Sequence, residues 1–95
     1  MNEIQKLEVT GTLDLHHFQP KEIVPLIDEF LNECLENSIL EGRIIHGKGI
    51  GTQRAIVQNH LKKHHLIEKF WNGNQDSGGW GSTGFKLSQL TPAVD

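Results

Sequence analysis

One amphipathic helical pattern between two short strand-like runs places the strongest constraint on the fold. From Pro20 onward, apolar residues recur three and four positions apart, which is the spacing of one buried face of an α-helix. Pro25 fits this helix if it begins near Lys21 or Glu22, because the missing N–H would then have no helical partner. The buried face is expected to consist of Ile23, Leu26, Ile27, Phe30, Leu31, Cys34 and Leu35.

Strand-like runs lie on both sides of this helix. Residues 7 to 17 alternate between apolar and polar side chains, and residues 43 to 46 form a short, apolar, β-branched run. Between the helix and the second run, Asn37-Ser38 and Glu41-Gly42 are expected to end the helix and turn the chain. Two strands joined by a helix are expected to lie parallel, through a right-handed crossover.

A second helix and two further strands follow. Thr52 is the expected N-cap of a helix that runs to about His64. Strands are predicted at residues 66 to 71 and 82 to 87, and they are expected to pair antiparallel because a short polar loop joins them. The second helix is expected to bury Ala55, Ile56 and Leu61 and to expose Arg54, Gln58 and Lys62.

The order of the elements is therefore βαβαββ. It predicts an α/β fold, a two-layer sandwich in which a four-stranded mixed sheet carries both helices on one face. A chain of 95 residues with 36% hydrophobic residues has room for one small core. We expect a single domain over residues 1–95, with a core from about residue 7 to residue 88 and a tail from 89 to 95.

Cysteine content and hydropathy indicate the compartment. Cys34 is the one cysteine and cannot form an internal disulfide, and no apolar run of a signal peptide stands at the N terminus. No stretch approaches the roughly 20 apolar residues of a membrane-spanning helix. The sequence predicts a cytoplasmic protein that does not enter a membrane.

Charge is unevenly distributed along the chain. Residues 1–41 contain two Lys and nine Asp or Glu residues, whereas residues 42–95 contain seven Lys or Arg and three Asp or Glu residues. Four of the six histidines also lie in the later part. A one-sided basic region of this kind can hold phosphates on an acidic protein, and a solvated helix face carrying lysines explains the charge alone equally well.

The glycine-rich loop after the second strand, GKGIG at residues 47 to 51, has the features of an anion site. It offers backbone amides, a lysine and the N terminus of the following helix. The alternative is a tight strand-to-helix turn that needs glycine torsion angles. Two nucleotide motifs do not fit, because Gly49 occupies the hydroxyl position of the phosphate-loop pattern and the glycine spacing of the dinucleotide pattern is one residue short.

Acidic and imidazole side chains are expected to meet this loop. Asp14 and His16 are two residues apart and share one face of the first strand. The carboxyl ends of parallel strands lie at one edge of the sheet, so this pair is expected near His46 and the glycine loop. Histidines move protons near neutral pH, and the group suits phosphodiester cleavage, with one histidine withdrawing a proton and the other protonating the leaving oxygen.

Three blocks in this order resemble the motifs of the Smr domain family, named for its relation to certain MutS-type mismatch-repair homologues. Residues 13 to 16 (LDLH) resemble the LDLHG element, residues 46 to 51 (HGKGIG) resemble HGxGxG, and residues 78 to 83 (GGWGST) resemble GGxGxT. The resemblance covers roughly residues 13 to 87, and the chain is identified as a free-standing member. It implies the βαβαββ sandwich, similar to the C-terminal domain of translation initiation factor three, and nucleic-acid binding with endonuclease activity on DNA or RNA.

The resemblance also implies roles for individual residues. Asp14 and His16 correspond to the residues most closely tied to cleavage in such domains. The histidine and glycines of the second block complete the pocket, here His46, Gly47, Gly49 and Gly51. His17 stands where the family often has glycine, and we expect His17→Gly to preserve activity while His16→Ala removes it.

The remaining candidates are basic, aromatic or hydroxyl-bearing. Trp80 has two open roles, stacking on an unpaired base or anchoring its loop. The residues expected to bind phosphate or nucleic acid are Gly47, Lys48, Gly49, Gly51, Arg54, Trp80 and Thr83, with Lys62 and Lys63 as further backbone contacts. His60 and His64 have helical i, i+4 spacing, but no acidic partner of the HExxH kind accompanies them, which favours a surface pair over a metal site.

Two functional classes remain open. One is an endonuclease, which would cut RNA without a cofactor by using the 2′-hydroxyl; DNA nicking needs activated water, for which a divalent metal such as Mg²⁺ is the candidate. The other is a non-catalytic module of the same fold that binds nucleic acid or the ribosome. DNA and RNA are therefore both expected partners, and the oligomeric state does not follow from the sequence.

Overall fold

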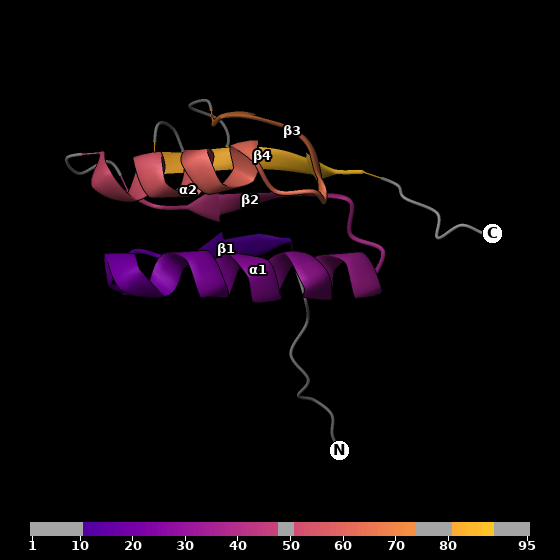
Figure 1. The fold of residues 1–95 in the computed structure, drawn as a ribbon, viewed down its shortest axis with the longest axis horizontal. Coiled ribbons are helices and arrows are strands. Elements are labelled where there is room, and N and C mark those ends of the chain that lie inside the picture. Colours follow the sequence, from indigo (N-terminus) through magenta and orange to yellow (C-terminus); the bar gives the residue numbers. More distant parts are fainter. Residues whose placement is uncertain (1–10, 48–50, 74–80, 89–95) are drawn as a thin grey trace, which may run out of the picture.

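The computed structural model describes residues 11–47, 51–73 and 81–88 of the chain. The order of its elements is β1, α1, β2, α2, β3 and β4, which confirms the predicted βαβαββ arrangement (Figure 1). The elements are β1 at Thr12–Asp14, α1 at Pro20–Glu36, β2 at Glu41–Ile45, α2 at Thr52–Lys62, β3 at Ile67–Asn72 and β4 at Ser82–Leu87.

The four strands form one mixed sheet in the order β1-β2-β4-β3. β1 and β2 run parallel, with Asp14 opposite Ile45, and β4 runs antiparallel to both of its neighbours. Both predicted pairings are confirmed. The parallel pair brings the carboxyl ends of β1 and β2 to the same edge of the sheet.

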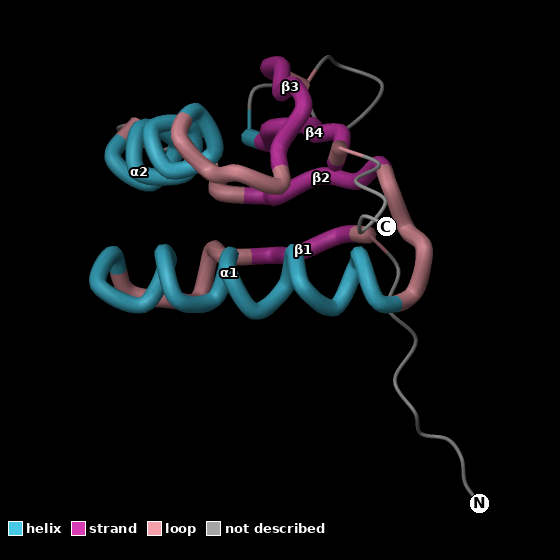
Figure 2. Tube along the Cα trace, turned by 45° about the vertical axis from the view of Figure 1, so that its right-hand side comes forward, coloured by secondary structure: helices cyan, strands magenta, loops and turns pink. Residues whose placement is uncertain are grey.

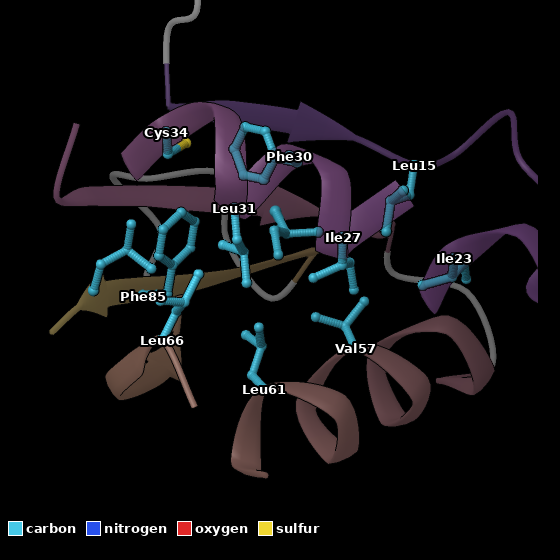
Figure 3. Packing of buried hydrophobic residues seen from close by; sticks show 12 residues of the cluster. Leu15, Ile23, Ile27, Phe30, Leu31, Cys34, Val57, Leu61, Leu66 and Phe85 are labelled. Atoms are coloured by element: carbon cyan, nitrogen blue, oxygen red, sulfur yellow. The ribbon is translucent and has the colours of Figure 1, made fainter. Parts of the chain in front are cut away.

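Both helices cover one face of this sheet and share one core (Figure 2). Phe30 of α1 and Phe85 of β4 meet edge to face, with ring centroids 5.8 Å apart. Val57 and Leu61 of α2 pack into the same cluster (Figure 3). Full burial stabilises by about 1.5–3 kcal/mol for each such side chain, so the packing of the helices on the sheet contributes strongly to the stability of the fold. None of the described helices is both long and apolar enough to cross a membrane.

Helix α1 keeps its predicted apolar face but not its predicted start. It begins at Pro20, which suits the first helical position, so Pro25 lies inside the helix rather than among the unpaired amides. A helix-interior proline costs about 3 kcal/mol. Five side chains buried on this face outweigh that cost, namely Ile23, Ile27, Phe30, Leu31 and Cys34.

The strand ends also differ from the prediction. β1 ends at Asp14 instead of continuing to His17, because the chain turns there and the N–H of Phe18 bonds to the carbonyl of Leu15 at 2.9 Å. Residues 7 to 10 of the predicted strand lie outside the described residues. Glu41-Gly42 belongs to β2 rather than to a turn, because it pairs with β4.

Helix α2 begins and packs differently from the prediction. Gly51, not Thr52, is the N-cap, and the helix ends at Lys62 rather than near His64. Ala55 is exposed, which corrects the predicted face, because Val57 and Leu61 are the residues one turn apart that meet the core.

Candidate active site

An exposed carboxylate and an imidazole lie together at the end of β1. The Oδ1 atom of Asp14 lies 2.6 Å from Nδ1 of His16. The same oxygen accepts a hydrogen bond from the backbone N–H of His16 at 3.1 Å. Each side chain is about half exposed. The two side chains that the sequence placed on one face are therefore in contact, although His16 lies on a turn and not in the strand.

These hydrogen bonds favour the charged form of the carboxylate. The His16 ring, helped by the His16 N–H, lowers the pKa of Asp14 below its usual value. Asp14 is an anion at neutral pH and can only accept a hydrogen bond, so Nδ1 of His16 carries the proton and donates it to this bond. The ring then has Nδ1 toward Asp14 and Nε2 away from it, which is how a carboxylate fixes the tautomer of a general base.

The turn after β1 is held against the start of α2. The N–H of Leu15 bonds to the carbonyl of Ile45 at 2.7 Å and extends the parallel pairing by one residue. Gln53, in the first turn of α2, donates its side-chain N–H to the carbonyl of Phe18 at 2.9 Å. The turn and the N terminus of α2 therefore lie side by side at the same edge of the sheet.

His46 follows β2 directly but lies in a buried network. Its Nδ1 lies 3.2 Å from the carbonyl oxygen of Gly47, and its Nε2 lies 2.8 Å from Oγ1 of Thr83. A carbonyl can only accept, so Nδ1 carries the ring proton and Nε2 accepts the hydroxyl proton of Thr83. The same hydroxyl oxygen accepts an N–H from Gln58 at 3.0 Å. Both ring nitrogens of His46 are therefore hydrogen-bonded to protein atoms.

The pKa of His46 agrees with this bonding. Burial lowers this pKa, since only 4% of the residue is exposed. The bond to the Gly47 carbonyl raises the pKa, and the positive charge of Arg54 lowers it further. The ring is thus neutral at pH 7, the form in which Nε2 can accept a hydrogen bond.

Asp14 and His46 project toward opposite faces of the sheet. Asp14 pairs with Ile45, and alternation along β2 puts His46 on the side of Ile44, which is fully buried against the helices. Among the residues that the structure describes, no hydrogen bond joins His46 to Asp14 or His16. The structure thus brings Asp14 and His16 together and places His46 in a separate network.

Two glycines of the loop after β2 adopt torsion angles that other residues rarely take. The φ angle is +86° at Gly47 and +88° at Gly51, and an added Cβ would meet no atom within 4 Å at either position. The requirement for glycine is therefore torsional rather than steric. The N–H of Gly47 bonds to the carbonyl of Gly81 at 3.0 Å, so this amide is used within the protein.

The N terminus of α2 keeps the features of an anion site. Its N-cap, Gly51, has no side chain that could bond to the first amides, and its first turn has no acidic residue but carries the exposed Arg54. Unpaired amides and a nearby cation favour a phosphate there. Of the other predicted binding residues, Thr83 is fully buried. Lys48, Gly49 and Trp80 lie outside the described residues.

Comparison with known proteins identifies the family. The sequence profile of the Smr domain matches residues 13–88. The chain belongs to the Smr domain family. The three motif blocks on which the resemblance rested fall within this match, so the family prediction is confirmed.

Curated relatives of this Smr domain are much longer proteins. Endonuclease MutS2 of Staphylococcus saprophyticus and that of Staphylococcus carnosus are each 37% identical to it over 71 residues. The aligned part covers 75% of this chain and 9% of each relative. This Smr domain is thus similar to a small part of those proteins.

Solved structures share the fold. The Smr domain of Thermus thermophilus MutS2 superposes with a TM-score of 0.79 at 26% identity, covering 83% of this chain and 99% of that one. YdaL, a stand-alone small MutS-related protein from Escherichia coli, superposes with a TM-score of 0.78 at 21% identity, covering 83% of this chain and 65% of that one. The predicted fold of this Smr domain is therefore confirmed.

Two glutamines of this Smr domain make contacts that the sequence did not predict. Gln58 was expected on the exposed side of α2, yet its side-chain N–H groups reach Thr83 at 3.0 Å and Asn72 at 2.8 Å. Gln53 links α2 to the turn after β1. No local pattern separates such residues from surface glutamines, because their partners lie on other elements.

Proposed function

We propose that this Smr domain binds nucleic acid and cleaves phosphodiester bonds, with Asp14 and His16 as the reacting pair. The observation that carries the proposal is their 2.6 Å contact in an exposed position beside the start of α2. An imidazole whose tautomer is held by a carboxylate is suited to general base catalysis. The names of the MutS2 relatives, which are endonucleases, support the same reaction.

We propose a division of roles at the sheet edge. Nε2 of His16 withdraws a proton from the attacking hydroxyl group, while Asp14 stabilises the imidazolium that forms. The N terminus of α2 and Arg54 bind the phosphate and its developing negative charge. In RNA the attacking group is the 2′-hydroxyl, and no cofactor is needed; in DNA it is water, which a divalent metal such as Mg²⁺ would activate.

The sequence predicted that His16 and His46 share the two proton transfers, one as base and the other as acid. Because both of its ring nitrogens are bonded to protein atoms, direct transfer would require the contact with Gly47 or Thr83 to open. We therefore give His46 a positioning role in the proposal, and the leaving oxygen takes its proton from water at the exposed site. It connects β2, the start of the glycine loop and β4 through side-chain and backbone bonds.

The test compares wild type, Asp14→Ala and His16→Ala on labelled single-stranded RNA and duplex DNA, with and without chelator. We expect each substitution to lower cleavage by about a hundredfold or more, as for loss of a general base or of its partner. His17→Ala is the matched control, since its ring lies beside that of His16, tilted by 39° with centroids 3.9 Å apart, but has no hydrogen bond to Asp14 among the described contacts.

The outcomes separate the two functional classes. Cleavage that persists in each of the two variants, Asp14→Ala and His16→Ala, would assign the activity to a contaminant or to another site. If wild type and all variants bind both nucleic acids equally and none of them cleaves, wild type included, the domain is a binding module for nucleic acid or the ribosome. Cleavage of DNA by wild type that is lost when chelator is added would indicate the metal-assisted route on DNA.

A further inference from the structure

A second cluster of ionisable side chains lies between the two helices. Asp28 of α1 faces His60 of α2 and His64, which follows the C terminus of α2. Oδ1 of Asp28 lies 2.8 Å from Nε2 of His60 and 3.1 Å from Nε2 of His64. The histidine pair thus has an acidic partner after all, supplied from another helix 32 residues earlier than His60. Asp28 lies roughly 12 Å along the axis of α1 from Pro20, so this cluster is separate from the candidate active site.

The three side chains have the spacing of metal ligands. Their ligand atoms all lie within 4.8 Å of one another. A tetrahedral Zn²⁺ ion with bonds of about 2.1 Å needs ligand atoms about 3.4 Å apart, so the two Asp28–histidine distances need to lengthen by about half an ångström. The side chain of Asp28 is 47% exposed, whereas those of His60 and His64 are 15% and 9% exposed. The carboxylate is therefore the ligand that can shift most easily.

A shallow pocket gives solvent access to these atoms. It is lined by Asp28, Asn32, His60, Lys63, His64 and His65. An ion can therefore reach the ligands without unfolding the helices, as a metal site requires. Lys63 is the cation of this lining, and its charge opposes a bound metal ion.

We propose that Asp28, His60 and His64 bind one first-row transition-metal ion of the Zn²⁺ class, with the fourth coordination position open to water. Two imidazoles and one carboxylate are the donor set that such ions prefer, whereas Mg²⁺ and Ca²⁺ prefer oxygen ligands. Because the ligands come from α1 and from α2 with its C-terminal extension, the ion links the two helices. This inference does not depend on the proposed nuclease function.

Binding changes the protonation of His64 in a measurable way. Without metal, Nδ1 of His64 accepts the backbone N–H of Leu66 at 3.1 Å, so the neutral ring carries its proton on Nε2 and donates it to Asp28. With metal, Nε2 becomes the ligand and the ring proton resides on Nδ1. The Leu66 amide then loses its acceptor, so its NMR signal reports directly on coordination at this ring.

The first test is a calorimetric titration of the folded chain with Zn²⁺. We expect one equivalent to bind, with an affinity at least tenfold lower in Asp28→Asn and in His60→Ala. Asp28→Asn is the conservative variant, because its amide oxygen still accepts hydrogen bonds from both rings while the anionic ligand is gone. His65→Ala is the matched control from the same pocket, and we expect its affinity to stay within twofold of wild type. Lys63→Ala is expected to bind Zn²⁺ more tightly.

The second test follows the amide signal of Leu66 during the same titration. We expect it to shift with one equivalent of Zn²⁺ in wild type, and not to shift in Asp28→Asn or with Mg²⁺. Equal binding by wild type and Asp28→Asn would overturn the proposal. So would a loss in His17→Ala as large as that in His60→Ala, because the ion would then be held by surface histidines elsewhere.

Discussion

The Nε2 atom of His46 lies 2.8 Å from the hydroxyl oxygen of Thr83, which ties the end of β2 to β4. The same oxygen accepts an N–H of Gln58 from α2. One buried hydroxyl group thus joins two strands and a helix directly beneath the edge of the sheet that carries the candidate active site.

Replacing Thr83 by valine should show how much this hydroxyl group contributes to the unfolding free energy. The shape is kept, but His46 and Gln58 each lose a partner in a buried position, which costs about 1–3 kcal/mol of unfolding free energy. Urea denaturation measures the change, and Thr83→Ser, which keeps the hydroxyl group, serves as the control. A loss in Thr83→Ser as large as that in Thr83→Val would contradict the prediction, because the hydroxyl group would then contribute no more to stability than the methyl group.

Stability should fall with acidification partly because of His46. Its folded pKa lies below the ordinary value of 6.5, so in acid the unfolded chain binds this proton first. The contribution of His46 is therefore complete above about pH 6.5 and is lost as the pH falls below it. Urea denaturation of wild type and His46→Gln between pH 7.5 and 5.5 tests this, and the variant should show the weaker pH dependence.

The comparison separates the contribution of His46 to the pH dependence of stability from that of His64. Burial also lowers the pKa of His64, which contributes in the same pH range. Both proteins contain His64, so its contribution cancels in their difference. Parallel pH profiles for wild type and His46→Gln would contradict the prediction.

Substitution of Gly51 should destabilise the start of α2 through its torsion angle alone. With φ at +88° and no atom near an added Cβ, Gly51→Ala should cost about 1–2 kcal/mol. Gly51→Asn should cost less, because asparagine enters the left-handed region more easily. Thermal or urea unfolding distinguishes the two, and an alanine variant as stable as wild type would exclude this conformation in solution.

Arg54→Ala should weaken nucleic-acid binding through the loss of one phosphate contact. The slope of the logarithm of the binding constant against the logarithm of salt concentration should decrease by about 1. Binding measured between 50 and 200 mM salt, about the range over which such contacts are screened, provides the slope. Lys62→Ala, at the other end of α2, is the comparison, because the sequence also predicted Lys62 as a backbone contact. An equal decrease in both variants would mean that binding follows general charge rather than the N terminus of α2.

Local patterns in the sequence were sufficient for the order of the elements. The three- and four-residue spacing from Ile23 to Leu35 predicted α1, and the alternation of Thr83, Phe85 and Leu87 predicted β4 with its observed bounds. Boundaries were less accurate where a residue's partners lie elsewhere. Glu41-Gly42 reads as a turn by itself and becomes a strand because β4 pairs with it.

The candidate site shows the same difference between contacts that a local pattern predicts and contacts between distant parts of the chain. The contact between Asp14 and His16 could be predicted from the sequence, because the two residues are two positions apart at a strand end and local geometry suffices. The burial of His46 against Thr83 and the contact of Asp28 with His60 and His64 could be found only in the folded structure. These contacts join residues more than thirty positions apart, and they depend on which faces of the helices and strands pack together, which no local spacing encodes.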